Sequence, residues 1–596
     1  MKKLALVLAV VMVLSLGLTA CGGSTSSTGT ASSAPAGSSS SGSASDAAPA
    51  YNPDALQVKA LDDNTLQVTL AARTPYFLEL TAFPAYAPVQ QATVEANGEA
   101  WAVDAATYIG NGPYKIAEWV PSSHITMVKN ENYWNVDSLA GPDTLQFTLM
   151  EDDAAQLTAF QSGELDFIDA VPNDKIHALS STPQFHKARQ IRTSSANYTA
   201  QAAPFDDPLV RQAFTLAVDR DYICKQIGKS GQIPAGAFVS EGLSDAAEGS
   251  SFREVGGDYY DPTAGANEAN LAKAKELLAE AGYPNGEGLP TITYLYNEGT
   301  GHQQIGEALQ QMWGQLGATV TLESQEWATF LNTRKNGDYQ VARNGWLGDY
   351  NDPISFLDMW ITGGGNNDAQ WSNAEFDSLI KQIKSSGDAE ARMEMMHQAE
   401  DIIFDEWMLC PIYYYVDIYM AQQNLENLST SPLGFKFFMN ASNGTDTLKV
   451  CTGPDPDTID PALNSAVDGG TMIDHAFEGL YTVAYGTTPT PGQAESVEIS
   501  EDGLTYTFHL REGLKWSDGT PLTAHDFVYS WQRAVDPATG ADYAYMFECI
   551  AGYTEAINGE EYVAPAADAS SASTSESAAE SVSASTSESA STSAAA

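Results

Sequence analysis

Two stretches of the chain alternate hydrophobic and polar residues with a period of two. LQVKALDDNTLQVTL covers residues 56–70 and VEISEDGLTYTFHL covers residues 497–510. Each contains two alternating runs around a tight turn, Asp63-Asn64 in the first and Asp502-Gly503 in the second, which is typical of a β-hairpin with one buried face. We expect the two hairpins to belong to one sheet, although they lie near opposite ends of the chain.

The middle of the chain follows a longer period. NLAKAKELLAEAGYP, residues 270–284, has apolar residues at 271, 274, 277, 278 and 281 before Gly282 and Pro284, which predicts an amphipathic helix. A strand (291–297), a helix (302–317) and another strand (318–324) are predicted next. This rhythm predicts an α/β fold with a parallel sheet and helices packed on it.

The stretch FKFFMNASNGTDTLKVCTGPDPDTIDP, residues 435–461, has the pattern of the last strand of a domain followed by the first strand of a new one. Residues 435–439 are typical of a last short strand and residues 440–447 of a polar connector. A new apolar run starts at 448–450, ahead of a loop rich in Pro and Asp. We therefore expect residues 435–455 to be a surface connection between two strands of one lobe.

Composition narrows the class of protein. A chain of 596 residues with 43% hydrophobic content can bury two or three cores. Its 77 acidic and 28 basic residues give a net charge of −49, which would repel nucleic acid and anionic lipid surfaces and keeps the protein soluble.

The first residues predict export. A basic start, a short apolar run and LTAC before Cys21 are typical of a secretory signal peptide over residues 1–20, and LTAC resembles the bacterial lipoprotein site. The resemblance implies lipidation of Cys21 and anchoring to the extracytoplasmic face of the cell membrane; the alternative is a plain signal peptide with a chance cysteine. Residues 21–50 are predicted to be a Ser/Gly-rich tether and residues 563–596 a disordered Ser/Ala-rich tail.

The other cysteines are Cys224, Cys410, Cys451 and Cys549. None has the spacing of a metal site, so no metal or cofactor is expected. One or two disulfides are conceivable outside the membrane, but the flanking sequences favour buried free thiols.

Several motifs resemble the oligopeptide-binding proteins of bacterial ABC importers, extracellular solute-binding family 5. They are, by residue range, GNGPYKIAEW with NENYWN (110–135), PFDDPLVRQAFTLAVDR (204–220), LLAEAGYP (277–284), GWLGDYNDP (345–353) and GLKWSDGTPLTAHDFVYSWQRAVDP (513–537). The resemblance implies a type II periplasmic-binding-protein-like fold, with two hinged lobes and an extra smaller domain. It also implies a peptide-binding function, an ABC permease as partner, and a monomer.

The order of these motifs differs from the family's order. The family has WSDGTPLTAHDFVYSW near its start and the KALDDNTLQVTL hairpin after it, whereas here they occupy 516–531 and 59–70. We interpret the chain as a circular permutant, joined through 441–447 and opened in an exposed loop of the smaller domain. The alternative is a rearranged gene whose product does not fold.

The resemblance also implies a domain organisation. The extra small domain would combine residues 51–138 and 481–562, lobe I would combine 139–192 and 415–480, and lobe III would be 193–414. The chain would cross between the two lobes near 189–200 and 411–421, which would form the hinge.

A protein that binds peptides of any sequence must bind what all peptides share. Asp349 matches the family's aspartate for the peptide ammonium; the alternative is a turn aspartate. Arg343, Arg334 and His302 match positions that receive the peptide carboxylate at different peptide lengths. For the arginines the alternative is a surface ion pair, which Arg334 would favour on its own.

Two segments match edges that pair with the peptide backbone: 344–347, including Trp346 and Leu347, and 465–467, including Ser465 and Val467. Trp327, Trp346 and Tyr543 match aromatic walls of the side-chain pockets, although isolated aromatics are more often core residues.

The other functional class that we consider for this chain is an enzyme. The sequence has no GxSxG, HExxH, GxxxxGK[ST] or dinucleotide motif, and nothing among its acidic residues singles out a carboxylate pair, so we expect a binding protein. Dipeptides, metal chelates and cell-wall peptides remain alternative ligands. The presence of Asp349, Arg343, Arg334 and His302 favours oligopeptides.

Overall fold

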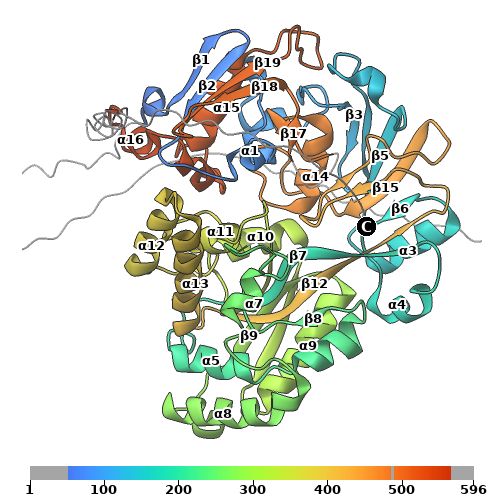
Figure 1. Ribbon diagram of the computed structural model, residues 1–596. Helices are drawn as coiled ribbons and strands as arrows, with labels where there is room; N and C mark the ends of the chain where they lie inside the picture. Colours follow the sequence, from blue (N-terminus) through green and yellow to red (C-terminus); the bar gives the residue numbers. More distant parts are fainter. Residues whose placement is uncertain (1–50, 248, 485–488, 565–596) are drawn as a thin grey trace, which may run out of the picture. The chain divides into compact units, whose positions relative to one another are not determined.

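The structure is a computed structural model that describes residues 51–247, 249–484 and 489–564. The predicted signal peptide, lipidation site at Cys21 and tether lie outside the described residues, as does the predicted tail from residue 565 onward. Figure 1 shows the arrangement of the elements.

A four-stranded sheet combines strands from both ends of the described chain. Its order is β1 (Val58–Asp62), β2 (Thr65–Thr69), β19 (Thr505–Leu510) and β18 (Ala494–Ile499), with every neighbour antiparallel. Tyr506, Phe508 and Leu510 alternate on the buried face of β19. The prediction of two hairpins in one sheet is confirmed.

The first and last described segments also lie side by side. The backbone N–H of Asn52 donates to the carbonyl of Ala556 at 2.9 Å, and its side-chain amide donates to the carbonyl of Glu560 at 2.6 Å. Helix α15 (Ala524–Val535) packs on β1 and β2, and Thr523 and Asp526 form a capping box at its start.

A second, mixed sheet has eleven strands and contains most of the remaining strands of the described chain. Along the sheet the strands are β10 (Val320–Gln325), β9 (Ile292–Asn297), β11 (Val341–Leu347), β7 (Phe185–Tyr198), β12 (Leu409–Ala421), β6 (Phe167–Ile168), β15 (Thr447–Gly453), β5 (Thr144–Leu149), β4 (His124–Lys129) and β3 (Tyr114–Val120), and β8 (Ile233–Pro234) pairs with β12.

The predicted parallel sheet is only part of this arrangement. Strands β10, β9 and β11 are parallel, and β15 is parallel to β5 and β6. Strands β11 and β12, however, are antiparallel to β7. The strand–helix rhythm of residues 270–324 therefore predicted its own region correctly and missed the antiparallel centre, which pairs segments that are far apart in sequence.

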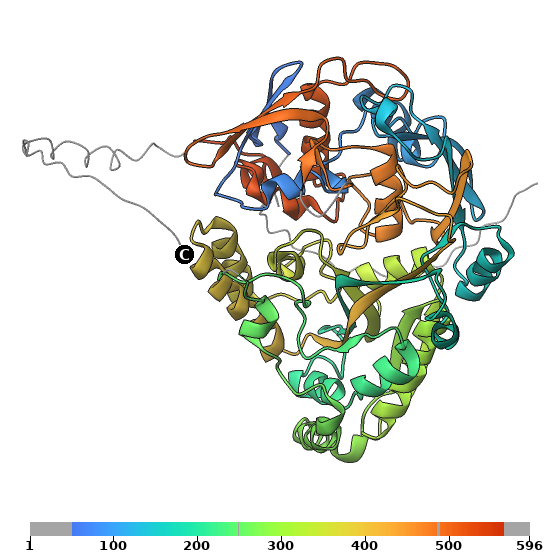
Figure 2. The same cartoon turned by 45° about the vertical axis from the view of Figure 1, so that its right-hand side comes forward.

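Strands β7 and β12 are the longest in the sheet and run side by side through its centre (Figures 1 and 2). The first half of β7 pairs with the second half of β12, close to β6, and the second half of β7 also pairs with β11. The two segments predicted to be crossings, 189–200 and 411–421, thus fall on one antiparallel pair. The proposed domain boundaries themselves remain predictions.

The stretch at 435–461 connects two short elements of one core. Strand β14 is Lys436–Phe437, and the next strand is β15. The ring of Phe438 packs against Phe147 and Phe167, and the backbones of these two residues pair with Val450. Residues 444–446 between the two strands are exposed. The exposed part of the connection is therefore shorter than predicted, because residues 435–439, 448 and 450–451 are buried. That the two strands belong to one lobe stays a prediction.

Helices cover the strands. Besides α15, the longer ones are α3 (Asp153–Ser162), α5 (Pro208–Leu216), α8 (Asn267–Glu280), α9 (Thr300–Gly314), α10 (Trp327–Lys335), α12 (Ala374–Ser385), α13 (Ala389–Asp405) and α14 (Val467–Ala476). Leu277 of α8 and Leu309 and Trp313 of α9 belong to one buried core with β9, as their spacing predicted. In the part of the chain that the structure describes, no helix is both long and apolar enough to span a membrane.

All four cysteines in the described part of the chain are free thiols. Cys224, Cys410 and Cys451 are buried, as expected, and Cys549 is only partly buried.

Candidate functional site

A cavity of about 480 Å³ is the candidate binding site. Its lining comes mainly from β7, β11, β12, α10 and the start of α14. Every residue predicted from the sequence to bind ligand is in this lining: His302, Trp327, Arg334, Arg343, Trp346, Leu347, Asp349, Ser465, Val467 and Tyr543. The structure therefore brings together residues from four separate parts of the sequence.

Asp349 is a carboxylate without a cationic partner among the described residues. The hydroxyl of Tyr543 donates to its Oδ1 at 2.9 Å, and the hydroxyl of Ser355 donates to its Oδ2 at 3.3 Å. Burial raises the pKa of Asp349 well above its ordinary value, and nearby Asp358 adds to this, while the two hydrogen bonds oppose it. A bound cation would therefore relieve an unfavourable charge.

The two predicted arginines differ in whether they have an ion-pair partner among the described residues. Arg334 forms an ion pair with Asp368, with 2.6 Å between Nε and Oδ2. Arg343 is only 8% exposed and has neither an ion-pair nor a hydrogen-bond partner in the described part of the molecule. Arg343 is therefore the better placed of the two to receive an anionic group from a ligand.

His302, on α9, is close enough to the arginines to be affected by their charge. Burial, and then the positive charges of Arg343 and Arg192, lower the pKa of His302 well below its ordinary value. The imidazole is thus neutral near pH 7, and it can bind a ligand through a hydrogen bond but not through charge.

Aromatic side chains and polar anchors form other parts of the wall. The indole N–H of Trp346 donates to the carbonyl of Ser355 at 2.6 Å, and its ring lies 6.5 Å from that of Tyr543. Ser465 donates to Asp542, and Asp542 pairs with Lys335 at 2.5 Å. These contacts hold the start of α14 next to α10.

Strand β11 has one edge that is largely open. It pairs with β7 over its whole length but with β9 only at Val341 and Ala342. From Arg343 to Leu347, no second described strand pairs with it. An extended ligand backbone could add to this edge, as the predicted role of residues 344–347 requires.

Some charged and polar groups in the lining were not predicted from the sequence. Lys436 is buried between Asp169 and Asp417, at 3.2 and 3.1 Å. Arg192 and Tyr415 come from the two central strands. The sequence signal for these two was their place in the predicted crossings, which drew attention to the segments as a hinge and not as part of the site.

Comparisons with known proteins agree with this picture. The chain matches the family described as "Bacterial extracellular solute-binding proteins, family 5 Middle" over residues 27–368 and 488–586. It is 36% identical to the dipeptide-binding protein DppE of Bacillus subtilis over 64% of this chain and 69% of the relative. It is 32% identical to the periplasmic oligopeptide-binding protein OppA of Salmonella typhimurium over 61% of this chain and 65% of the relative, so just under two thirds of that relative is spanned.

Solved structures of the same kind are similar. The Haemophilus influenzae OppA complex with the peptide RPPGFSPFR matches with a TM-score of 0.57 and 28% identity, over 62% of this chain and 71% of that chain. The Escherichia coli murein tripeptide binding protein MppA matches with a TM-score of 0.57 and 30% identity, over 64% and 72%.

The fold and the lined cavity define a solute-binding protein. Every relative named here is a binding protein and not an enzyme, as expected from the sequence. The chain belongs to family 5 of the bacterial extracellular solute-binding proteins.

Proposed function

We propose that this protein captures oligopeptides in the cavity and delivers them to the permease of an ABC importer. Asp349 binds the peptide ammonium, Arg343 the carboxylate, and the open edge of β11 the backbone. Arg334 and His302 serve peptides of other lengths, and Trp327, Trp346 and Tyr543 line the side-chain pockets. The cavity closes on the ligand by bending at β7 and β12.

The single observation that carries this proposal is the charge pattern of the cavity. Among the residues that the structure describes, one wall holds an aspartate without a cation, Asp349, and another holds a buried guanidinium without an anion, Arg343. A free peptide supplies both missing charges, at its two ends. A buried charge is costly until it is paired, so ligand binding resolves both costs together.

The proposal extends to the parts of the chain before the described residues. LTAC and Cys21 support a lipid anchor that keeps the protein near its permease. Two of the relatives are named for binding dipeptides and a murein tripeptide, which makes short peptides the second candidate ligand class. The same two charged groups would bind the ends of those peptides.

The first prediction tests the role of Asp349. Asp349→Asn keeps the size of the side chain but removes the charge that pairs with the ammonium. Loss of one partner of a buried pair costs roughly 3–5 kcal/mol, so calorimetry should show affinity for free peptides lowered by about two to four powers of ten. N-acetylated peptides, which carry no ammonium, should bind the native protein poorly and be affected far less.

The matched control is Asp338→Asn, because Asp338 is an exposed aspartate just before β11. It should bind peptides as the native protein does. Equal affinity of the native protein for free and acetylated peptides would show that Asp349 does not bind the ammonium.

A further inference from the structure

We propose that Arg192 and Arg343 together form an anion site for two carboxylates, which selects peptides whose C-terminal residue is Asp or Glu. The inference rests on the proposed function and adds a specificity to it. One guanidinium binds the α-carboxylate of the last residue, and the other binds its side-chain carboxylate.

Strand register puts the two arginines on one face of the sheet. In the antiparallel β7–β11 pair, Arg192 is opposite Leu347 and Arg343 is opposite Ala196. Residues at alternate positions share a face, and directly opposite residues point to the same side. Arg343 and Leu347 are four positions apart, so Arg192 shares their face, and all three line the cavity.

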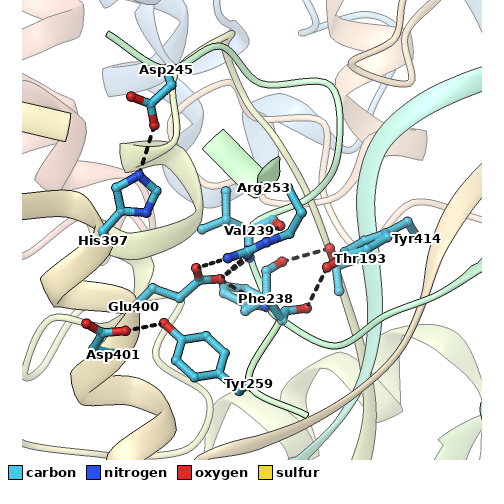
Figure 3. A network of polar contacts seen from close by, with 11 residues as sticks. Thr193, Phe238, Val239, Asp245, Arg253, Tyr259, His397, Glu400, Asp401 and Tyr414 are labelled. Atoms are coloured by element: carbon cyan, nitrogen blue, oxygen red, sulfur yellow. Dashed lines mark hydrogen bonds and ion pairs between the residues drawn. The ribbon is translucent and has the colours of Figure 1, made fainter. Parts of the chain in front are cut away.

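Contacts on the other face of the sheet fix this orientation (Figure 3). Thr193, next to Arg192, donates to the carbonyl of Phe238 at 2.8 Å, and Tyr414, next to Tyr415, donates to the carbonyl of Ala237 at 3.3 Å. Because neighbouring residues of a regular strand point to opposite faces, the bond of Thr193 directs Arg192 into the cavity. Tyr415 lies where the register of β12 shifts, and it also lines the cavity.

Glu400 holds in place the segment at 237–239, whose carbonyl groups accept these two hydrogen bonds. Its Oε1 accepts from the backbone N–H groups of Phe238 and Val239 at 3.0 and 2.8 Å, and its carboxylate pairs with both terminal nitrogens of Arg253 at 2.8 Å (Figure 3). The orientation of Arg192 is therefore supported by a fully buried network.

Arg192 and Arg343 have no carboxylate partner in the part of the protein that the structure describes. Neither side chain has an ion pair in the described ranges, and the Nε atoms of both are buried without a hydrogen-bond partner. The other cationic side chains of the lining are all paired: Arg334 with Asp368, Lys335 with Asp542, and Lys436 with Asp169 and Asp417.

The charges of the two guanidinium groups act on the same two side chains, His302 and Tyr415. Arg192 lies over the ring of Tyr415, 4.3 Å from its centre. Both arginines lower the pKa of His302 and that of Tyr415, so both are near the two residues. Guanidinium groups bind carboxylates in pairs of parallel hydrogen bonds, and a single α-carboxylate can occupy only one such fork fully.

The experiment compares two peptides that differ in one charge. Calorimetry on the native protein measures affinity for Ala-Ala-Glu and Ala-Ala-Gln, and for the same pair lengthened by one or two alanines at the N-terminus. We expect the Glu peptide to bind about 10-fold more tightly or better at the preferred length. Arg192→Gln should abolish this preference while Ala-Ala-Gln still binds, and Arg192→Lys should keep part of it.

Arg189→Gln is the matched control, since Arg189 is an exposed arginine of the same strand outside the cavity lining. It removes the same charge and should leave the preference intact. Equal affinities of the native protein for the Glu and Gln peptides at every length, or an unchanged preference in Arg192→Gln, would overturn the inference while leaving peptide binding intact. If no peptide of either kind binds, the proposed function fails and the inference with it.

Discussion

Tyr415 lies under Arg192, whose guanidinium is 4.3 Å from the centre of its ring, and the charges of Arg192 and Arg343 both act on it. Burial, the largest single influence, would raise the pKa of Tyr415, but the positive charges of Arg192 and Arg343 together with hydrogen bonding to Ser194 and Tyr413 lower it to about 7. In the free protein the phenolate therefore supplies part of the missing negative charge. A ligand carboxylate between the arginines would take over that role.

This competition predicts that peptide binding depends on pH. A bound carboxylate raises the pKa of Tyr415 again, so the complex holds more protons than the free protein above pH 7. By linkage, affinity should fall as pH rises through about 7 toward 10, by up to tenfold per unit. Calorimetry at pH 8.5 in buffers of different ionisation enthalpy should show proton uptake on binding, and tyrosinate absorbance should decrease.

Tyr415→Phe is the control, because it removes the titrating group and keeps the ring under Arg192. The ammonium of the peptide also titrates near pH 8, but it does so equally with both proteins. Burial keeps Tyr294 and Tyr413 protonated in this range, and His302 is neutral. Proton uptake that persists in the variant would show that Tyr415 is not the group responsible.

The sequence predicted which residues line the site better than it predicted their ion-pair partners and orientations. Family motifs located Asp349 and Arg343, and both line the cavity. An ion pair was the alternative interpretation of Arg334 and the structure contains one, but its partner Asp368 could not be predicted, because it lies in a loop 34 residues later. Arg192 was missed for a local reason: in RTSSAN both faces of the strand carry polar residues, so the pattern does not tell which face is the cavity face.

At the scale of elements, the carboxylate of Glu400 links α13 to the segment that covers the central strands. Glu400 is 0% exposed and accepts hydrogen bonds from the segment at 238–239 and from Arg253 of α7 (Phe252–Gly256). It is therefore the point where two helices and the loop over β7 meet. Its partner Arg253 is also buried.

We predict that Glu400→Gln destabilises the fold strongly. The neutral amide leaves the buried Arg253 guanidinium without a counter-charge, which costs roughly 3–5 kcal/mol of unfolding free energy. Urea denaturation should show this loss. Glu394→Gln, at an exposed position of the same helix, should stay within about 0.5 kcal/mol of the native protein. A Glu400→Gln protein as stable as this control would mean that the network contributes little.

Helices and strands with a clear local period were predictable from the sequence, whereas the pairing between distant strands was not. The hairpins at 56–70 and 497–510 and the helices and strands of 270–324 show clear periods, and the structure contains all of them. The central antiparallel pairing joins β7 to β12, and no local period encodes that partnership. Its strands are buried over much of their length, so they alternate weakly.

At the scale of the whole molecule, the connectivity of the chain supports the interpretation as a circular permutant. Asn52 is hydrogen-bonded to Ala556 and Glu560, so the start and the end of the described chain are neighbours. The small sheet needs strands from both ends. The connector at 444–446 is exposed and makes mostly local hydrogen bonds, as expected of a link between two former ends.

The chain should therefore tolerate being opened at the connector and closed at its present ends. We predict that a chain starting at Thr445 and ending at Gly444, with residue 562 joined to Tyr51 by a short Gly/Ser linker, folds and binds peptide with unchanged affinity. Few contacts are lost, because residues 444–446 are exposed and the joined ends already lie together. Urea denaturation and calorimetry on the purified chain measure both properties.

Opening the chain between Val450 and Cys451 is the contrasting control, since both residues are buried at 0% exposure within β15 and that chain should not fold. If the chain opened at 444 and 445 is insoluble or does not bind, the connector is an integral part of the fold and the permutation interpretation is wrong.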